Sequence, residues 1–328
     1  MTRVLSGIQP TGDMHLGNYL GAVRNWVDEQ HKHDAFFTIV DLHALTIPQD
    51  PAMLRTKIRE LFMLLIASGL DPEVCTLFVQ SHLHEHAELG WIMTCTASIG
   101  ELQRMVQFKE KSAKQGSDFI SAGLLTYPAL QAADIVLYDA DLVPVGEDQR
   151  QHVEITRDIA QRFNHRYGDT FVIPEAVTPP SGARVMDLQN PTNKMSKSAE
   201  SPQGTVGVLD DFKDIERKFK RAVTDNDGEV RYDVAAKPGV SNLLSILGGA
   251  TGARAQDLAA NYTQYGPLKA DAAAAVIEAL RPVQARFGEL AHDLGEVTRL
   301  MNVGADKARV VASATLTRAK KALGLSID

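Results

Sequence analysis

Short apolar runs alternate with amphipathic helical patterns up to about residue 200, and this alternation constrains the fold more than any other feature. The segments AFFTIV (35–40), TLFVQ (76–80) and LVP (142–144) each have the composition of a buried strand. Between the first two, apolar residues from 54 to 66 recur at helical spacing. Strands that alternate with helices predict an α/β fold with a doubly wound parallel sheet.

The second part of the chain is different. Beyond about residue 200 the strand signals fade, and residues 212–223 form an amphipathic pattern with a basic face. Residues 270–328 are rich in alanine and have a helical pattern. We therefore expect a helical C-terminal domain after the α/β domain.

Composition excludes several classes of protein. The 328 residues carry a formal net charge of -7, which argues against nonspecific coating of nucleic acid but leaves room for a local basic face. The two cysteines, Cys75 and Cys95, form no CxxC pair, which fits a reducing compartment. The N-terminus lacks a signal-peptide pattern and no apolar run reaches membrane-spanning length. We expect a cytoplasmic protein.

The stretch PTGDMHLGN (10–18) follows a short first strand that starts with RVL and ends by Gly7, and it precedes a helical pattern. Backbone N–H groups at the start of a helix attract phosphate, and Gly12 and Gly17 would allow close approach of a ligand. His15 and Asn18 could donate hydrogen bonds to phosphate oxygens. An ordinary strand-to-helix junction explains this stretch equally well.

A second candidate motif is NKMSKS (193–198). Two lysines with interleaved hydroxyls suit a loop that closes on a triphosphate and stabilises charge on leaving pyrophosphate. Taken alone, the composition favours a solvated surface loop.

Together these stretches resemble the two signature motifs of class I aminoacyl-tRNA synthetases. The whole chain is similar to the bacterial tryptophanyl family, and the matching stretches run from residue 6 to about 244. They include SGIQPTG, VDLHALT, SAGLLTYPALQAADIVLY, VPVGEDQRQHVEITRDIAQRF, NPTNKMSKS and KPGVSNLL. The resemblance implies a Rossmann-like catalytic domain that uses ATP with Mg²⁺ to activate L-tryptophan and then transfers it to tRNA(Trp).

The resemblance also implies which residues contact ATP. Expected contacts with the nucleotide are Gln9, Pro10, Thr11, Gly17, Asn18, Gly146, Glu147, Asp148, Val185, Lys194, Met195, Ser196, Lys197 and Ser198. The residues expected to assist catalysis are Lys194, Lys197, Lys111, Asn18 and Gln9. Of these, Lys111 could equally be a solvated lysine on a charged loop.

Asp134 is the central residue of the expected tryptophan pocket. It lies in the apolar stretch QAADIVLY, an unusual setting for an acid. Indole offers one N–H donor and no acceptor, so a buried carboxylate selects tryptophan over phenylalanine. A helix-internal Asp bonded to backbone or to an arginine is the structural alternative. By resemblance the pocket also holds Tyr127, Gln131, His43, Val143, Val145, Gln149 and Leu5.

Two pocket positions depart from the family pattern. Leu5 stands where close relatives usually carry an aromatic residue, and Gln131 stands where they usually carry methionine. Both affect how tightly the expected pocket would hold the indole ring. A tyrosyl-specific relative, a small-molecule nucleotidyltransferase and a non-catalytic paralogue are the competing interpretations.

The resemblance implies three parts of the chain and a homodimer. We expect a catalytic domain over 1–199, a helical anticodon-binding domain over 200–295, and a C-terminal helix over 296–328 that packs back on the catalytic domain. The basic face on 212–223 could contact tRNA phosphates or be solvated. The alternating histidines of SHLHEH (81–86) resemble a metal site, but no cluster of acids or cysteines accompanies them, and we expect no metal site in the protein itself.

Overall fold

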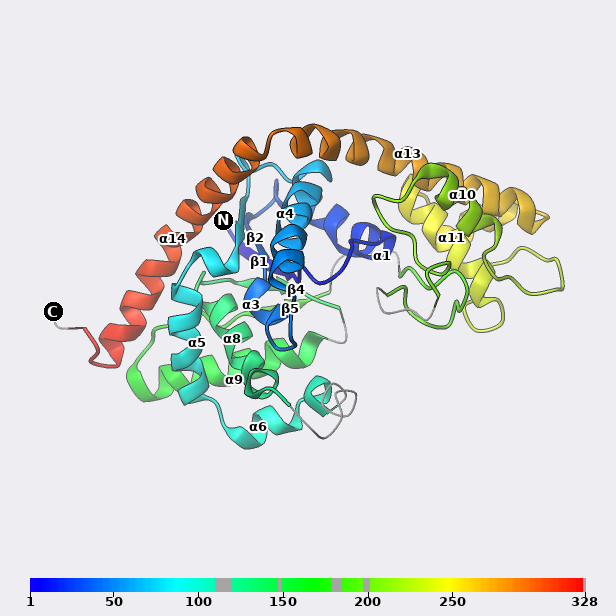
Figure 1. Ribbon diagram of the computed structural model, residues 1–328. Helices are drawn as coiled ribbons and strands as arrows, with labels where there is room; N and C mark the ends of the chain where they lie inside the picture. Colours follow the sequence, from blue (N-terminus) through cyan, green and yellow to red (C-terminus); the bar gives the residue numbers. More distant parts are fainter. Residues whose placement is uncertain (110–119, 147–148, 179–183, 197–200, 327–328) are drawn as a thin grey trace.

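A five-stranded parallel sheet forms the centre of the protein (Figure 1). The computed structural model describes residues 1–109, 120–146, 149–178, 184–196 and 201–326. The strands are β1 (Arg3–Ile8), β2 (Asp34–Ile39), β3 (Thr76–Val79), β4 (Leu142–Pro144) and β5 (Glu175–Val177). Their order is β3-β2-β1-β4-β5, and every pair is parallel. The predicted α/β fold with a doubly wound parallel sheet is confirmed.

The strand order reverses direction between β1 and β4. The chain first builds outward from β1 to β2 and β3, and then crosses to β4 and β5 on the other side. In open α/β sheets the carboxyl ends of the strands at such a switch point form the ligand crevice. This edge of the sheet is therefore where the fold favours an active site.

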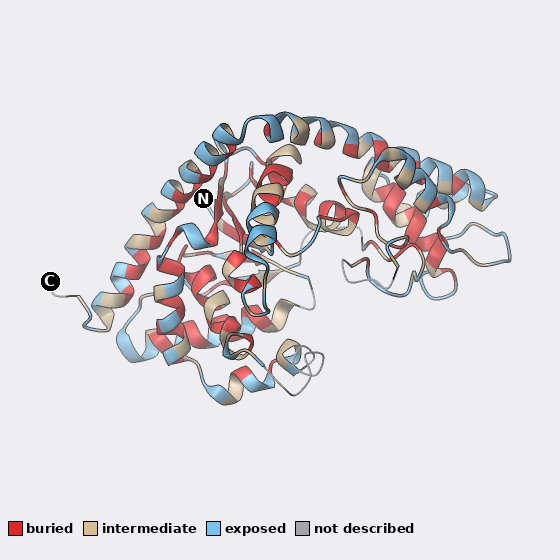
Figure 2. Ribbon diagram, viewed as in Figure 1, coloured by how far each residue is buried: buried red, intermediate tan, exposed pale blue. Residues whose placement is uncertain are grey.

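Both faces of the sheet are covered, which explains the continuous apolar runs. On β2, Phe37 stacks on Trp26 with ring centroids 5.0 Å apart, while Phe36 packs on Tyr138 at 5.0 Å. Phe36 and Phe37 belong to two separate hydrophobic clusters, one on each face. Figure 2 shows this burial on the strands and on the inward sides of the helices.

Helices connect the strands in the first part of the chain. They are α1 (Leu16–Asn18), the π-helix η1 (Tyr19–Val23), α2 (Arg24–Glu29), α3 (Asp41–Ala44), α4 (Pro51–Ala67), the 3₁₀-helix η2 (Gln80–His82), α5 (Glu85–Thr96), α6 (Ile99–Arg104), α8 (Ala122–Val136) and α9 (Arg150–Tyr167). In α4, the Asp50 side chain accepts a hydrogen bond from Met53 N at 2.7 Å, and Pro51 occupies the first turn. The predicted helix over 54–66 lies within α4.

Strand β5 has no counterpart in the prediction. It is only three residues long, follows a proline and begins with an exposed glutamate, so no alternation develops. Its pairing with β4 over three positions places it in the sheet.

The second part of the described chain is helical. It contains α10 (Phe212–Lys220), α11 (Pro238–Thr251), α12 (Ala255–Leu258), the 3₁₀-helix η4 (Ala259–Asn261), α13 (Tyr265–His292) and α14 (Leu294–Ala322). The helical region expected from 270 onward is divided at Asp293, whose side chain accepts from Glu296 N at 2.9 Å and starts α14. Figure 1 shows α13 and α14 as an arc that joins the α10–α11 region to the sheet.

Helix α14 packs closely on the edge strand β3. A Cβ added at Gly304 would lie only 1.8 Å from the carbonyl oxygen of Leu77. Ser313 also donates to Glu85 at 2.5 Å, and Lys320 pairs with Glu88 at 2.7 Å. These contacts attach the end of the chain to β3 and α5. No helix in the described part of the chain is both long and apolar enough to cross a bilayer.

Candidate active site

Asp134 is a buried carboxylate held by side chains from three other elements. Its Oδ2 accepts from His43 Nε2 at 2.7 Å, and its Oδ1 accepts from Gln80 Nε2 and His86 Nδ1, both at 2.7 Å. The Asp134 side chain is 4% exposed. Because an ionised carboxylate only accepts hydrogen bonds, both histidine nitrogens carry the proton in these contacts.

The sheet explains why these side chains meet. His43 lies in α3, just after the carboxyl end of β2, and Gln80 directly follows β3. Neighbouring parallel strands end at the same edge, so His43 and Gln80 converge on the carboxylate from α8. The site therefore lies at the edge that the strand order favours.

The hydrogen bonds keep Asp134 ionised. Burial alone would raise its pKa, but the hydrogen bonds from His43 and His86 outweigh burial and hold the pKa well below its usual range. A carboxylate offers about four acceptor positions. Donors from the described residues occupy two acceptor positions on Oδ1 and one on Oδ2. Oδ2 can therefore accept one more hydrogen bond, from a ligand N–H.

A second layer fixes the orientation of His86. Its Nε2 lies 2.7 Å from the hydroxyl of Tyr138, a residue with no exposed surface. Burial, followed by the nearby charge of Asp134, raises the pKa of Tyr138 well above its ordinary value, so the phenol keeps its proton. The phenol O–H then donates to His86 Nε2, which leaves the proton of a neutral imidazole on Nδ1, facing Asp134.

Tyr127 stands on another side of this site. Its ring lies edge-on to His43, with centroids 6.2 Å apart, and its hydroxyl lies 2.6 Å from His152 Nε2. Burial raises the pKa of Tyr127 to about 12, so it remains a neutral phenol at physiological pH. A neutral phenol is suited to holding an ammonium group or an aromatic ring.

Apolar residues of the expected pocket lie at the switch point itself. Leu5 on β1 and Val143 on β4 are buried, and the two strands pair through Val4 and Leu142. Val145 is half-buried beyond β4, and its N–H donates to Val177 O at 3.0 Å.

The two glutamines expected in the pocket are both half-buried. Gln131 lies in α8, three residues before Asp134. Gln149 occupies the N-cap position of α9 and donates from its backbone to Gly146 O at 3.0 Å.

The first motif forms a turn and the start of a helix. After β1, Pro10 is buried, Gln9 is exposed and Thr11 is half-buried, while Gly12 adopts a φ of +68° that favours glycine. The backbone N–H of His15 donates to Asn18 Oδ1 at 3.3 Å, across the first turn of α1. This bond leaves the amide NH₂ of Asn18 as a donor pair for a ligand.

The helix that follows this turn is irregular. α1 passes without interruption into η1, a π-helical segment, and then into α2. Such π-helical insertions are frequent at functional sites. Within the motif, Met14 is a core residue and Asp13 pairs with Lys57 at 2.6 Å.

The described part of the second motif, residues 193–196, lies on a short antiparallel hairpin. Met195 N donates to Val185 O at 3.1 Å, and Asp187 N donates to Asn193 O at 2.9 Å. Lys194 is exposed, Ser196 is half-buried, and the side chain of Met195 is buried in the core. A ligand would therefore meet the Lys194 side chain and the backbone near Met195.

Two sets of contacts bring the motifs together. Leu16 N donates to Val206 O at 2.8 Å, and Val208 N donates to Met14 O at 2.9 Å, so the first motif pairs with the segment after the second. A Cβ added at Gly17 would lie 3.7 Å from the Cβ of Val185. The glycine-rich turn and the hairpin are thus adjacent.

A family model described as tRNA synthetases class I (W and Y) matches residues 1–281. The chain belongs to this family.

Individual members of the family are similar to the chain over almost its entire length. Tryptophan--tRNA ligase 2 of Streptomyces avermitilis is 54% identical over 325 residues, which cover 98% of this chain and 96% of that protein. The crystal structure of tryptophanyl-tRNA synthetase from Mycoplasma pneumoniae superposes with a TM-score of 0.92 at 36% identity, covering 99% of this chain and 98% of that one. The Campylobacter jejuni enzyme complexed with ADP and tryptophane has a TM-score of 0.84 at 33% identity, covering 99% and 100% of the two chains.

Five residues expected to bind ATP or to assist catalysis lie outside the described residues. They are Lys111, Glu147, Asp148, Lys197 and Ser198. Gly146, which precedes two of them, is exposed just beyond β4.

Four residues that support Asp134 or Tyr127 are not among the predicted site residues. Gln80 and His86 bond to Asp134, Tyr138 bonds to His86, and His152 bonds to Tyr127. TLFVQ ends at Gln80 and QAADIVLY ends at Tyr138. His86 was considered as one of three histidines for a metal, but in the structure it turns inward to Asp134 while His82 and His84 are exposed. The position of a polar residue directly after a buried strand was the available signal for Gln80.

Two of the basic side chains on the predicted basic face of α10 form ion pairs within the protein. Lys218 turns to Asp210 at 2.6 Å and to Thr205 O at 2.7 Å, and Arg217 pairs with Asp214 at 2.8 Å. Lys218 thereby braces the segment that pairs with the first motif. Lys213, Lys220 and Arg221 are exposed.

Proposed function

We propose that the chain is a tryptophan–tRNA ligase. It activates L-tryptophan with ATP to tryptophanyl-adenylate and pyrophosphate, and then transfers the tryptophanyl group to tRNA(Trp). The observation that carries the amino-acid specificity is the buried, ionised carboxylate of Asp134, with acceptor capacity left on Oδ2. The 54% identity to a tryptophan--tRNA ligase along nearly the whole chain supports the same assignment.

Asp134 would select tryptophan through its indole N–H. An indole bound at the switch point would donate this N–H to Oδ2 and lie against Leu5 and Val143. Phenylalanine offers no donor and would leave the carboxylate with an unused acceptor in a buried site. Tyr127 and Gln149 would receive the ammonium group of the substrate.

Adenylate formation needs no protein nucleophile. The tryptophan carboxylate oxygen attacks the α-phosphorus of ATP, a P–O bond forms, and the bond to the β-phosphate oxygen breaks to release pyrophosphate. The protein then contributes orientation and charge stabilisation. We assign these roles to Gln9, Asn18 and Lys194, together with Lys111 and Lys197.

The nucleotide would lie between the two adjacent motifs. In this proposal Pro10, Thr11, Gly17 and the backbone of Val185 contact the base and sugar side, and Met195, Ser196 and Ser198 line the phosphates. Gly146, Glu147 and Asp148 would hold the ribose. Support comes from the approach of Gly17 to Val185 and from the exposure of Lys194.

Mg²⁺ would enter with ATP, because it is usually held in such sites by substrate phosphates and water. Among the described residues no group of three or more His, Cys, Asp or Glu side chains could hold a metal ion. When bound, the ion would neutralise phosphate charge, and Lys194 would add to this from the protein side.

The tRNA and a second copy of the chain are the proposed macromolecular partners, in the cytoplasm. We propose residues 1–199 as the catalytic domain, 200–295 as the anticodon-binding domain and 296–328 as a helix that returns to the catalytic domain. The contact of Gly304 with β3 supports the last assignment. Trp91 and Ile99, which are 69% and 68% exposed on the consecutive helices α5 and α6, are candidate contacts with the second copy.

Amino-acid-dependent ATP–pyrophosphate exchange tests this function. The protein is assayed with tryptophan, with tyrosine and with buffer alone, and we expect exchange with tryptophan only. Exchange with tyrosine only would show that the specificity is wrong. No exchange with either amino acid would favour a non-catalytic paralogue.

A further inference from the structure

Asn242 on α11 binds both backbone groups of Met186, a residue of the hairpin that carries the described part of the second motif. Its Oδ1 accepts from Met186 N at 2.8 Å, and its Nδ2 donates to Met186 O at 2.9 Å. The side chain is buried, with 4% of its surface exposed. A buried amide that satisfies both backbone groups of one residue fixes that residue in position and orientation, since loss of either bond would leave a buried polar group unpaired.

Met186 lies next to Val185 in the chain and opposite Lys194 in the hairpin. It directly follows Val185, whose carbonyl accepts from Met195 N, and it forms a bridge with Lys194. Movement of Met186 would therefore displace both the proposed adenine contact and the proposed phosphate lysine.

The far end of the hairpin is held separately. Asp187 Oδ1 accepts from the backbone N–H groups of Gln189 and Asn190 at 2.7 and 2.8 Å, and Leu188 N donates to Gly204 O at 2.9 Å. These contacts define the turn. On the other strand Thr205 Oγ1 donates to Ser196 O at 3.0 Å. Asn242 is the side chain that holds the backbone of Met186, beside Val185.

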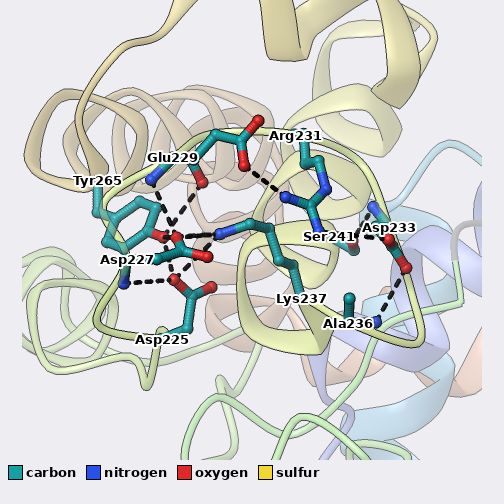
Figure 3. Close-up of polar contacts among 9 residues, drawn as sticks. All are labelled: Asp225, Asp227, Glu229, Arg231, Asp233, Ala236, Lys237, Ser241 and Tyr265. Carbon is teal, nitrogen blue, oxygen red and sulfur yellow. Dashed lines mark hydrogen bonds and ion pairs between the residues drawn. The ribbon is translucent and has the colours of Figure 1, made fainter.

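The start of α11 is a fixed platform for Asn242. Figure 3 shows the Lys237 ammonium among Asp225, Asp227 and the hydroxyl of Tyr265, with the Asp225 contact at 3.1 Å and the Tyr265 contact at 3.2 Å. The Lys237 side chain is 1% exposed. Tyr265 begins α13, so this cluster joins the starts of two helices.

Ser241 and Gly239 add to this platform. Ser241 Oγ accepts from Asp233 N at 2.9 Å, also visible in Figure 3. A Cβ added at Gly239 would lie 2.1 Å from Val223 O, so the helix backbone touches the preceding segment directly. Asn242 projects from a turn of α11 that these contacts hold against the preceding segment.

We propose that Asn242 is a positioning residue for ATP: it holds Met186 so that the hairpin presents Val185 and Lys194 to the nucleotide. This inference rests on the proposed function, because it takes the hairpin as part of the ATP site. It assigns a role in nucleotide binding to a residue of the helical region, far in sequence from both motifs.

The experiment compares two substitutions of Asn242 with one control. Asn242→Asp keeps an acceptor for Met186 N but sets a carboxylate against Met186 O, whereas Asn242→Leu removes both bonds at similar volume. Ser245→Ala is the control, since Ser245 lies on the same helix and its hydroxyl bonds only within it, to Ser241 O at 2.8 Å. ATP–pyrophosphate exchange is measured against ATP and against tryptophan, with active-site titration and thermal unfolding of each variant.

We expect both Asn242 variants to raise the KM for ATP by about 10-fold or more, as for loss of buried hydrogen bonds. The KM for tryptophan should change less than about 3-fold, within the range of additivity for separate sites. KM does not depend on the fraction of folded enzyme, so a partly folded preparation still gives a result. Ser245→Ala should match the parent enzyme.

Lys194→Ala separates failure of the inference from failure of the proposed ATP site. If Lys194→Ala impairs ATP use and the Asn242 variants do not, Asn242 is not a positioning residue and the ATP site stands. If Lys194→Ala leaves ATP use unchanged, the hairpin is not part of the ATP site and both proposals fail. Equal increases in both KM values for the Asn242 variants would indicate a general structural role and overturn the inference.

Discussion

Asp134→Asn changes the chemistry of the amino-acid pocket with little change in volume. The carboxylate now accepts from His43 on one oxygen and from Gln80 and His86 on the other. An amide has one acceptor oxygen and one NH₂ group. The favoured arrangement keeps the oxygen toward Gln80 and His86 and turns the NH₂ group toward His43.

His43 can accept this NH₂ group if its proton moves to the other ring nitrogen. The fold would then keep all three contacts of Asp134. The indole N–H of tryptophan would instead meet a donor at the position where Oδ2 stood. The lost bond is one to a charged acceptor, worth about 1.5–3 kcal/mol. At about 1.4 kcal/mol per factor of ten, kcat/KM for tryptophan should fall roughly 10- to 150-fold.

The assay is ATP–pyrophosphate exchange at varied tryptophan and varied ATP. We expect the KM for ATP to remain within about 2-fold of the parent value, because Asp134 is not part of the proposed nucleotide site. Asp41→Asn is a matched control: Asp41 is also a buried acid after β2, and its carboxylate bonds to Ser81 N at 2.9 Å and to Ser81 Oγ at 2.5 Å. Equal loss of tryptophan and ATP use in Asp134→Asn would refute the reasoning and make Asp134 structural.

Three further outcomes follow from the same contacts. Tyr138→Phe removes the hydroxyl that orients His86, so kcat/KM for tryptophan should fall about 5-fold or more, with ATP use unchanged in exchange assays. Gly304→Ala should lower the free energy of unfolding by urea by about 1–3 kcal/mol, because its Cβ would lie 1.8 Å from a β3 carbonyl oxygen. Gly288→Ala is the control and should not destabilise the protein, because a Cβ there meets nothing within 4 Å. The lowered folded-state pKa of Asp134 means that its carboxylate stabilises the fold above the unfolded pKa of about 3.9 and loses this contribution as pH falls further. The stability difference between the parent protein and Asp134→Asn should therefore shrink below about pH 4 in urea titrations, and a constant difference would contradict this.

The sequence predicted the sheet because parallel strands carry a local signal. Residues 35–40 and 76–80 are continuous apolar runs, and the structure has β2 and β3 there. Strand β5 was not predicted, because three residues beginning with an exposed glutamate depend on pairing with β4 for their conformation. Pairing of this kind is a tertiary effect that a local pattern does not contain.

The site was predicted unevenly for a similar reason. Asp134 could be selected from the sequence because an acid in an apolar helix is unusual. Its partners His86 and Gln80 come from other elements, and only the meeting of α5, α8 and the end of β3 reveals them. Asn242 had no chemical signal beyond its place in KPGVSNLL, since an amide becomes informative only when its backbone partners are known.

The central claim is that the Asp134 carboxylate recognises the indole N–H. A tryptophan analogue in which sulfur replaces that N–H keeps the shape of the bicyclic ring but has no donor. The direct measurement compares kcat/KM for tryptophan with that for this benzothiophene analogue, in the parent enzyme and in Asp134→Asn. We predict that the parent enzyme prefers tryptophan by about 10-fold or more and that the preference largely disappears in Asp134→Asn. Equal use of both amino acids by the parent enzyme, or an unchanged preference in the variant, would contradict the claim.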